Sequence, residues 1–146
     1  MKITERKTYN ASASDLWAII HDPDNLPAWN PKCVTSDSLQ NSKTNERFKV
    51  TFEMNGKRTE GYGEILEHRE DQMIRFRYHY DHSEKPKTAD ETFELIPKGK
   101  KTKVKHTVDL SGTGLPTWTT ILILLISRFG RKAGTGPLDG IKCLLD

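Results

Sequence analysis

The chain has 146 residues, which is the usual size of one domain and enough to bury a hydrophobic core, so we expect a single domain over residues 1–146. Charged residues make up 29% of the chain and hydrophobic ones 34%, a balance typical of a polar, soluble globular protein. The net charge of +3 is below the level that by itself indicates nucleic-acid binding, and we expect no nucleic-acid partner.

Three features of the sequence indicate the cellular compartment of the protein. Cys33 and Cys143 stand far apart without a CxxC motif, so we expect free thiols in a reducing compartment. Residues 1–10 hold no apolar segment of a secretory signal, and we expect a cytoplasmic protein. The run ILILLIS from Ile121 is shorter than the ~20 residues that span a bilayer, which predicts a core helix and no stable membrane insertion.

A strand and two short helices are predicted at the start of the chain. Residues 2–9 alternate in character and indicate a strand. The segment SASDLWAIIHD offers Ser12 or Ser14 as an N-cap and has apolar residues at helical spacing. Pro23 ends this helix, because proline lacks an N–H and disfavours helix in the residue before it. A second helical turn is predicted over 24–29, where Trp29 fills the gap between this corner and the sheet.

Antiparallel strands joined by turns are predicted from Cys33 to Leu110. The clearest hairpin turns at Asn55-Gly56, which places Phe52 opposite Thr59, Val50 opposite Gly61 and Phe48 opposite Gly63. The next strand, MIRFRYHY, is predicted to pair Ile74 with Ile65, which puts Phe76 beside Gly63 and Tyr78 beside Gly61.

A further hairpin is predicted to turn over residues 97–101. Pairing Leu95 with Thr102 places Phe93 opposite Val104 and Glu91 opposite His106, all on the apolar face. A carboxylate and an imidazole in that position can hydrogen-bond, which fixes the His tautomer.

The tail from Pro116 predicts a long helix that is interrupted at RKAGTGP and resumes with Leu138, Ile141 and Leu145. Trp118 and Leu122 belong to its apolar stripe. Ile123 and Leu124 fall off the stripe, and three explanations stay open: a homodimer contact, a membrane-touching patch, or ordinary burial.

Four stretches carry a resemblance to a known superfamily: ASASDLWAIIHDPDNLPAWNP, GYGEILE, ETFELIPKGKKTKVKHTVDL and GPLDGIKCLLD. In this order they resemble the START-like, or helix-grip, superfamily (SRPBCC), in particular its polyketide cyclase/dehydrase and lipid-transport branch. The resemblance implies an α+β helix-grip fold: a curved antiparallel sheet of about seven strands wrapped around a long C-terminal helix, with two short helices after the first strand. It also implies a cavity between sheet and helix. The last helix is more broken by glycine than in the family, and the family offers no fixed catalytic signature.

Candidate ligand-binding residues follow from this fold and from the inward faces of the strands. Gly61 and Gly63 either mark a bend in the sheet or leave space on its inner face. Aromatic residues facing inward are either core packing or cavity wall. The candidate set is Trp29, Phe48, Val50, Phe52, Gly61, Phe76, Tyr78, Tyr80, Glu91, His106, Trp118 and Leu122.

The favoured function is the binding or transport of a small hydrophobic ligand such as a lipid, polyketide or aromatic compound. An enzyme of the cyclase or dehydratase type, using Glu91, His106 and a tyrosine for proton transfer, is the first alternative. An interaction module that uses the apolar C-terminal helix is the second. His79 and His82 have HxxH spacing without further ligands, so we expect no metal, and no motif indicates a cofactor.

Overall fold

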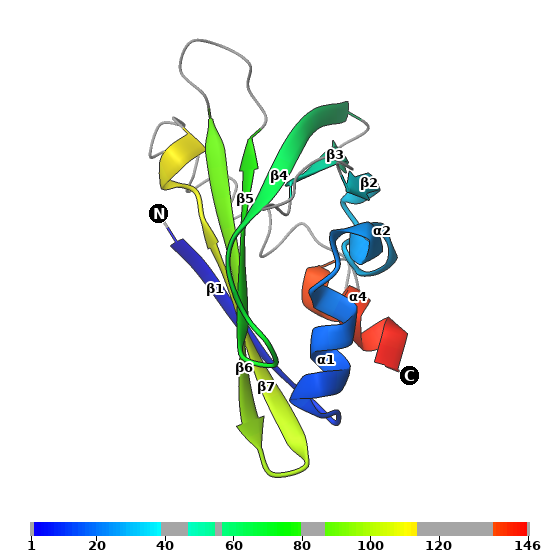
Figure 1. Cartoon of the computed structure of the whole chain (residues 1–146), viewed down its shortest axis with the longest axis vertical. Helices are drawn as coiled ribbons and strands as arrows, with labels where there is room; N and C mark the ends of the chain where they lie inside the picture. The colour runs from blue at the N-terminus through cyan, green and yellow to red at the C-terminus, as the bar shows by residue number, and fades with distance from the viewer. Residues whose placement is uncertain (1, 39–46, 55–56, 80–86, 114–135, 146) are drawn as a thin grey trace.

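Seven antiparallel strands form one curved sheet in the computed structural model, which describes residues 2–38, 47–54, 57–79, 87–113 and 136–145. The strand order is β1-β7-β6-β5-β4-β3-β2, so β1 and β2 form the two edges. The strands are β1 (Lys2–Tyr9), β2 (Cys33–Ser38), β3 (Arg47–Met54), β4 (Lys57–Arg69), β5 (Met73–His79), β6 (Thr88–Lys98) and β7 (Lys101–Asp109). The predicted curved sheet of about seven strands is confirmed (Figure 1).

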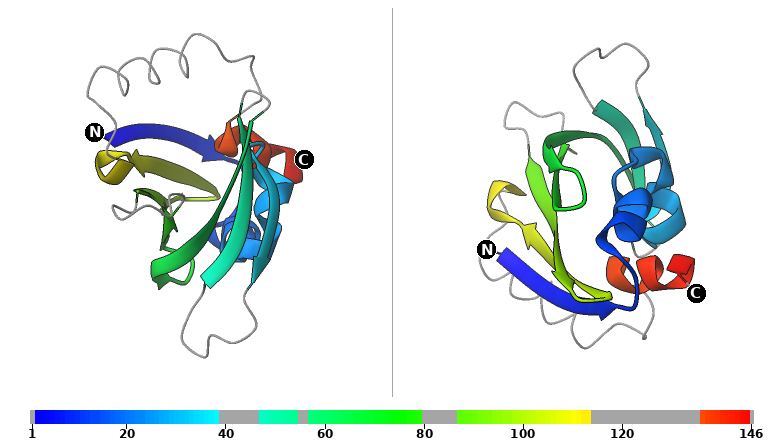
Figure 2. Two further views of the ribbon diagram at one scale, coloured as in Figure 1. Left: turned by 90° about the horizontal axis from the view of Figure 1, so that it is seen from above. Right: turned by 60° about the horizontal axis from the view of Figure 1, so that its bottom comes forward.

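The helices gather against one face of this sheet, which we call the inner face (Figure 1 and Figure 2). They are α1 (Ala13–Ile20), the 3-10 turn η1 (Pro23–Asn25), α2 (Leu26–Trp29) and α4 (Pro137–Leu145). A second 3-10 turn, η2 (Ser111–Thr113), follows β7. The two short helices after the first strand are confirmed. The predicted long helix, with Trp118, Leu122, Ile123 and Leu124, lies outside the described residues.

Local signals account for the corner between β1 and β2. The Ser12 hydroxyl accepts a hydrogen bond from the Asp15 amide at 3.1 Å and caps α1, as predicted. The Asp22 carboxylate caps η1 in the same way at 2.9 Å. The next acidic residue, Asp24, accepts from the amide and the hydroxyl of Ser38, so the corner is tied to the end of β2.

Trp29 fills the space between this corner and the sheet, as the sequence predicted. Its side chain is buried, and its ring meets the ring of Phe93 edge to face, with the centroids 5.3 Å apart. On the other side, a Cβ on Gly140 of α4 would overlap the backbone carbonyl of Trp29. Glycine at this position therefore lets α4 lie directly on α2.

Helix α4 is also fastened to β1. The Tyr9 hydroxyl donates to the Leu138 carbonyl at 2.6 Å, and the Lys7 ammonium pairs with Asp139 at 2.9 Å. Leu138 and Ile141 are buried, as the apolar spacing of this segment predicted. Within the described ranges, no helix combines the length and the apolar character needed to cross a lipid bilayer.

The β3–β4 hairpin has the predicted register: Phe52 pairs with Thr59, Val50 with Gly61 and Phe48 with Gly63. The predicted β4–β5 register is wrong by two residues, since Tyr78 pairs with Gly63 and Phe76 with Ile65. Two features cause the difference. A three-residue loop joins Arg69 to Met73, with Asp71 in the left-handed region (φ 60°), and a bulge interrupts the pairing between Ile65 and Glu67.

The predicted β6–β7 register is also wrong by two residues. Leu95 pairs with Val104, and Phe93 pairs with His106, because the strands continue to Lys98 and Lys101. The connection is only two residues long, with Gly99 at φ 65°. An even shift keeps every side chain on its predicted face, so Glu91 and His106 still point to the same side of the sheet.

Replacing Gly140 tests the contact between α4 and α2. We expect Gly140→Ala to lower the free energy of unfolding by roughly 1–3 kcal/mol, because a new Cβ inside a packed contact forces the backbone apart. Chemical denaturation measures the change. Cys143→Ala, at an exposed position of the same helix, serves as the control and should change stability by less than about 0.5 kcal/mol. A Gly140→Ala protein as stable as the parent would contradict this packing.

Candidate functional site

The inner face of the sheet collects most of the residues predicted from sequence. Because side chains alternate along a strand, every second residue of β3 to β7 points to the helices. Phe52 and Gly61 are partly buried there. Three predicted residues, Tyr80, Trp118 and Leu122, lie outside the described part of the chain. The remaining predicted residues are buried: Trp29, Phe48, Val50, Phe76, Tyr78, Glu91 and His106.

Glu91 and His106 form a buried hydrogen-bonded pair. The Glu91 Oε1 atom lies 2.7 Å from the His106 Nε2 atom, and the two side chains are 9% and 6% exposed. The sequence predicted that the two residues lie directly opposite each other, and this is wrong, since Glu91 pairs with Val108 across the strands. The contact runs diagonally to the neighbouring pair, which long side chains can reach. Since an ionised carboxylate only accepts hydrogen bonds, the Nε2 atom donates.

Aromatic rings hold the imidazole in place. The His106 ring stacks on the ring of Phe93, with centroids 4.5 Å apart and planes 17° from parallel. Phe93 in turn meets Trp29 edge to face. One flat side of the imidazole is therefore covered by an aromatic ring whose own position is set by Trp29.

Tyr78 and Cys33 lie near the Glu91 carboxylate. Burial raises the pKa of the Tyr78 hydroxyl well above its usual value. The negative charge of Glu91 raises this pKa further, and so does the close approach of its carboxylate, although the two groups do not meet in hydrogen-bond geometry. Burial, with a smaller contribution from Glu91, also raises the pKa of the Cys33 thiol to about 11. Both groups are therefore neutral at physiological pH and face the region of one buried carboxylate.

Three buried polar atoms on this side of the molecule make no hydrogen bond in the described structure. They are the indole Nε1 of Trp29, the hydroxyl of Ser36 and the hydroxyl of Tyr78. Native proteins satisfy nearly all such groups, and each exception calls for an explanation, such as a water or ion. A bound ligand supplies partners in the same way.

Ser36 and Cys33 are inner-face residues that the sequence did not reveal. The β2 strand reads CVTSDS, in which no apolar alternation marks a buried side. A register shift between Cys33 and Thr35 then moves Ser36 onto the same face as Val50, its partner on β3. The available signal was the cysteine itself, because free cysteine is among the most buried residue types.

The space beside Gly63 is occupied. A Cβ on Gly63 would overlap the ring of Phe48, its partner across β3 and β4. Phe48 also meets Phe76 and Tyr78 edge to face, at 6.0 and 6.1 Å between centroids. The space that this glycine leaves on the inner face is therefore filled by an aromatic ring and is not open to a ligand. The bulge of β4 falls two residues later, at Ile65–Glu67.

The chemistry available on the inner face is hydrogen bonding and proton exchange. Glu91, His106 and Tyr78 offer a carboxylate, an imidazole and a phenol in one apolar setting. His79, for which the sequence offered HxxH spacing but no further metal ligands, points to the outer face, where its Nε2 atom lies 2.9 Å from Glu64. Among the described residues, no three His, Cys, Asp or Glu side chains are grouped closely enough to hold a metal ion.

Solved structures with the same fold cover nearly the whole chain. The protein TTHA0849 from Thermus thermophilus is 14% identical and aligns with a TM-score of 0.71, over 97% of this chain and 94% of its own. A START superfamily protein from Mycobacterium smegmatis is 14% identical, with a TM-score of 0.69 over 99% of both chains. The Zhui aromatase/cyclase from Streptomyces sp. R1128 is 10% identical, with a TM-score of 0.68 over 88% of this chain and 85% of its own.

These similarities confirm the START-like, helix-grip fold that the sequence resembled, and at these identities they establish the fold alone. No curated protein sequence matches the chain. A family model does match, over residues 10–121, and its description is Activator of Hsp90 ATPase homolog 1-like protein. The match extends over more than half of the sequence, from the start of the two-helix corner past the last strand. The chain therefore belongs to the Activator of Hsp90 ATPase homolog 1-like family, and its fold is the START-like fold.

Proposed function

We propose that this protein binds a small, mainly apolar molecule, such as a lipid, a polyketide or an aromatic compound, against the inner face of its sheet. The observation that carries the proposal is the set of three buried, unpartnered polar atoms, on Trp29, Ser36 and Tyr78, beside the aromatic residues of that face. A ligand with an apolar body and few polar atoms fits such a lining, which is the usual composition of a small-molecule site.

The unpartnered atoms also indicate which hydrogen-bonding groups the polar part of the ligand must have. An indole N–H only donates, so Trp29 requires an acceptor such as a carbonyl oxygen. Each buried polar atom left unpaired costs about 1–3 kcal/mol, and a ligand that supplies the missing bond recovers that cost. The Glu91 carboxylate is close enough to raise the pKa values of Tyr78 and Cys33, and it disfavours a second negative charge beside it. A neutral carbonyl compound suits this site better than a carboxylate.

Within this proposal the Glu91–His106 pair is a polar anchor. The carboxylate holds the ring nitrogen at 2.7 Å, and the stacked Phe93 ring keeps the imidazole from turning. Both groups thus stay in one orientation without the ligand, so little ordering is required when it binds.

An enzyme of the cyclase or dehydratase type is the alternative. The observation in its favour is the unpartnered Tyr78 hydroxyl near Glu91 and His106, which gives an acid and a base in one region. The similar fold of an aromatase/cyclase is consistent with it. Chemistry requires these groups to surround the ligand, whereas a carrier needs only the volume and the anchors.

Removing the Tyr78 hydroxyl separates ligand binding from a purely structural role. We expect Tyr78→Phe to be at least as stable as the parent, because the lost hydroxyl had no partner to lose. We expect the affinity for prodan, a neutral aromatic ketone, to fall about 5- to 10-fold, the effect of one hydrogen bond. Fluorescence titration measures the affinity and thermal denaturation the stability.

Tyr62→Phe is the matched control, since Tyr62 stacks on His79 on the outer face and should leave prodan binding unchanged. Equal prodan affinity in Tyr78→Phe and the parent would remove Tyr78 from the site. Failure of the parent protein to bind prodan at all would count against the proposed carbonyl ligand.

Thiol labelling tests how well the inner face is closed to water. Because burial raises the pKa of the Cys33 thiol to about 11 in the folded protein, the thiol stays protonated until the pH is strongly alkaline. At pH 8 only ~0.1% of it is the reactive thiolate. Cys143 is exposed.

We therefore expect a maleimide at pH 8 to modify Cys143 at least 100-fold faster than Cys33, as read by mass spectrometry of the peptides. The rate at Cys33 should rise with pH. Unfolded protein, in which both thiols are accessible, provides the reference rates. Comparable labelling of the two cysteines in the folded protein would contradict a closed inner face.

A further inference from the structure

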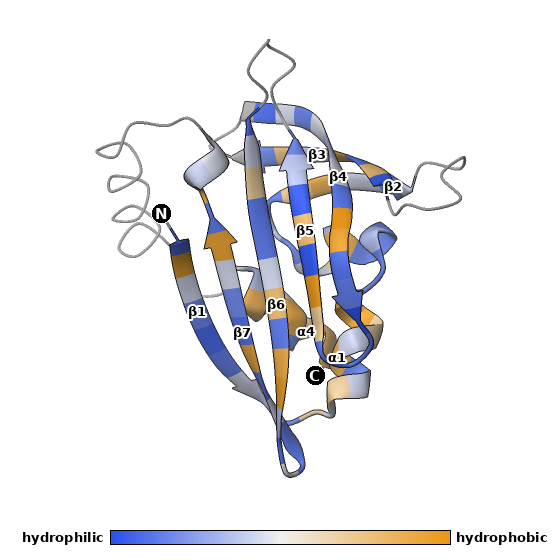
Figure 3. Cartoon of the chain, turned by 60° about the vertical axis from the view of Figure 1, so that its left-hand side comes forward, coloured by the Kyte–Doolittle hydropathy of each residue, from blue (hydrophilic) through white to orange (hydrophobic). Residues whose placement is uncertain are grey.

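A second site lies on the outer face of the sheet, away from the proposed ligand. Figure 3 views this face, where polar residues alternate with apolar ones along the strands. The η2 turn folds back towards β6 and leaves a hollow of about 190 Å³. Its lining residues are Arg75, Arg77, Thr88, Asp90, Asp109, Ser111 and Gly112.

Gly112 permits the close approach that forms one wall of this hollow. A Cβ at this position would overlap the Thr88 hydroxyl and lie 2.9 Å from the Thr88 carbonyl oxygen. Any larger residue would push η2 away from β6, because a backbone atom cannot yield as a flexible side chain can. The hollow therefore forms because η2, directly after β7, packs closely against Thr88 of β6.

Two arginines form the positive side of the hollow. Arg75 and Arg77 are two residues apart on β5 and therefore point the same way. Arg77 binds the Asp90 carboxylate through Nε at 2.7 Å and Nη2 at 3.0 Å, and Arg75 reaches the same carboxylate through Nη2 at 2.6 Å. Their side chains are 39% and 36% exposed and line the hollow. Each guanidinium group has five N–H donors, more than its contacts with Asp90 use.

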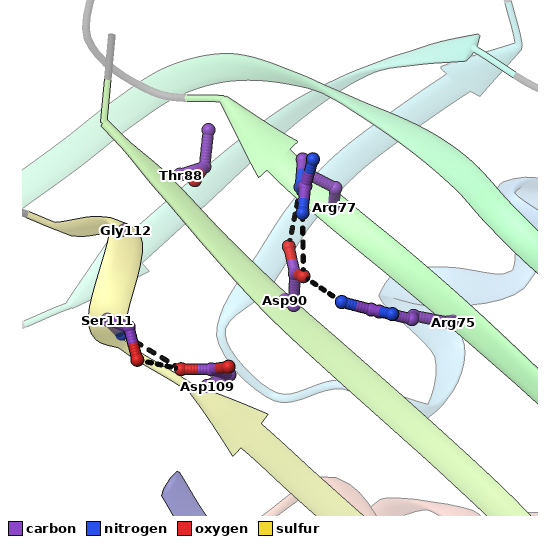
Figure 4. A pocket seen from close by; sticks show the side chains of 7 residues that line it. All are labelled: Arg75, Arg77, Thr88, Asp90, Asp109, Ser111 and Gly112. Carbon is purple, nitrogen blue, oxygen red and sulfur yellow. Dashed lines mark hydrogen bonds and ion pairs between the residues drawn. The ribbon is translucent and has the colours of Figure 1, made fainter. Parts of the chain in front are cut away.

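Asp109 forms the negative side. It pairs with Asp90 across β6 and β7, and Figure 4 shows it on the opposite side of Asp90 from the two arginines, beneath η2. Its Oδ1 atom accepts from the amide and the hydroxyl of Ser111, which lowers its pKa. The ion pairs with the arginines lower the pKa of Asp90 as well. Both carboxylates are therefore ionised at neutral pH.

The balance of charges selects the ligand. An anion alone would meet the two carboxylates of the lining, and a cation alone would meet its two guanidinium groups. Lys2, the partner of Asp109 across β1 and β7, adds positive charge near that carboxylate. A molecule that carries both charges satisfies both sides. The volume of about 190 Å³ is below the ~300–1,000 Å³ of typical drug-sized sites, which restricts the ligand to a few heavy atoms.

We propose that this hollow binds a small zwitterion of the α-amino acid class, with the carboxylate on Arg75 and Arg77 and the ammonium group on Asp109. Arginine suits a carboxylate because its planar fork donates two parallel hydrogen bonds. The site shares no side chain with the inner face, so it can bind whether or not the proposed apolar ligand exists.

NMR titration of the whole protein tests the proposal with three probes: L-alanine, acetate and methylammonium. The titrations use dilute sodium chloride without a buffer, with every stock set to the same pH, because sulfonate buffers are zwitterions and phosphate is itself a ligand for arginine. We expect L-alanine to shift the backbone amides of Ser111 and Gly112 in a saturable way, with an affinity at least tenfold above that for acetate or methylammonium. No saturable shift with L-alanine, or equal affinity for acetate, would overturn the proposal.

Two variants test which residues bind the ammonium group and the carboxylate of the ligand. Asp109→Asn keeps an acceptor for Ser111 but removes the charge, so L-alanine should bind at least fivefold more weakly while acetate binds no more weakly than to the parent. Arg75→Gln should weaken both probes. Arg58→Gln, which breaks an exposed ion pair with Glu53 on β3, is the control and should change neither. L-alanine binding that is unaffected in Asp109→Asn would contradict the assigned ammonium position.

Discussion

A carboxylate inside a protein must be paired, and the pairing of Glu91 with His106 decides what the inner face of this sheet can do. The pair depends on the β6–β7 register, which the two-residue connection at Gly99 sets. It depends as well on Phe93, which stacks on the imidazole and rests against Trp29. Trp29 is held in turn by α4, whose Gly140 lies against its carbonyl. A chain of contacts thus runs from the last helix through the two-helix corner to the only buried carboxylate–imidazole pair of the described structure.

Strands β5 and β6 contribute side chains to both faces of the sheet, because successive side chains along a strand point to opposite faces. On β5, Tyr78 points inward to the aromatic cluster, whereas Arg77 beside it points outward to Asp90. On β6, Glu91 points inward and Asp90 outward. The inner face is apolar with a few unpaired polar atoms. On the outer face, charged side chains form ion pairs, such as those of Arg75 and Arg77 with Asp90. Two different classes of ligand, one apolar and one zwitterionic, are therefore proposed for opposite sides of the same strands.

Much of the fold was predictable because its signals are local. Asn55-Gly56 gave the β3–β4 register correctly, and Ser12 was a correct N-cap. The errors in strand register arose at three irregular places, where the number of residues between paired positions cannot be read from the sequence: the bulge at Ile65–Glu67, the loop at Asp71 and the short connection at Gly99. No pattern of residue types reveals a bulge, since it depends on how two strands twist against each other. Even so, the contact between Glu91 and His106 was predictable, because an even shift leaves both on one face. Ser36 was not, because the irregularity in β2 moves it inward.

The central claim is that a ligand atom completes the hydrogen bonding of the buried inner face, and the indole N–H of Trp29 reports on it most directly. Its resonance in a ¹H–¹⁵N spectrum can be identified by its loss in Trp29→Phe. The measurement is the position of this resonance in protein stripped of apolar molecules and again after addition of prodan. The account predicts a downfield shift that saturates with the fluorescence titration, as the N–H gains an acceptor. An indole resonance that stays in place while prodan binds would contradict the account.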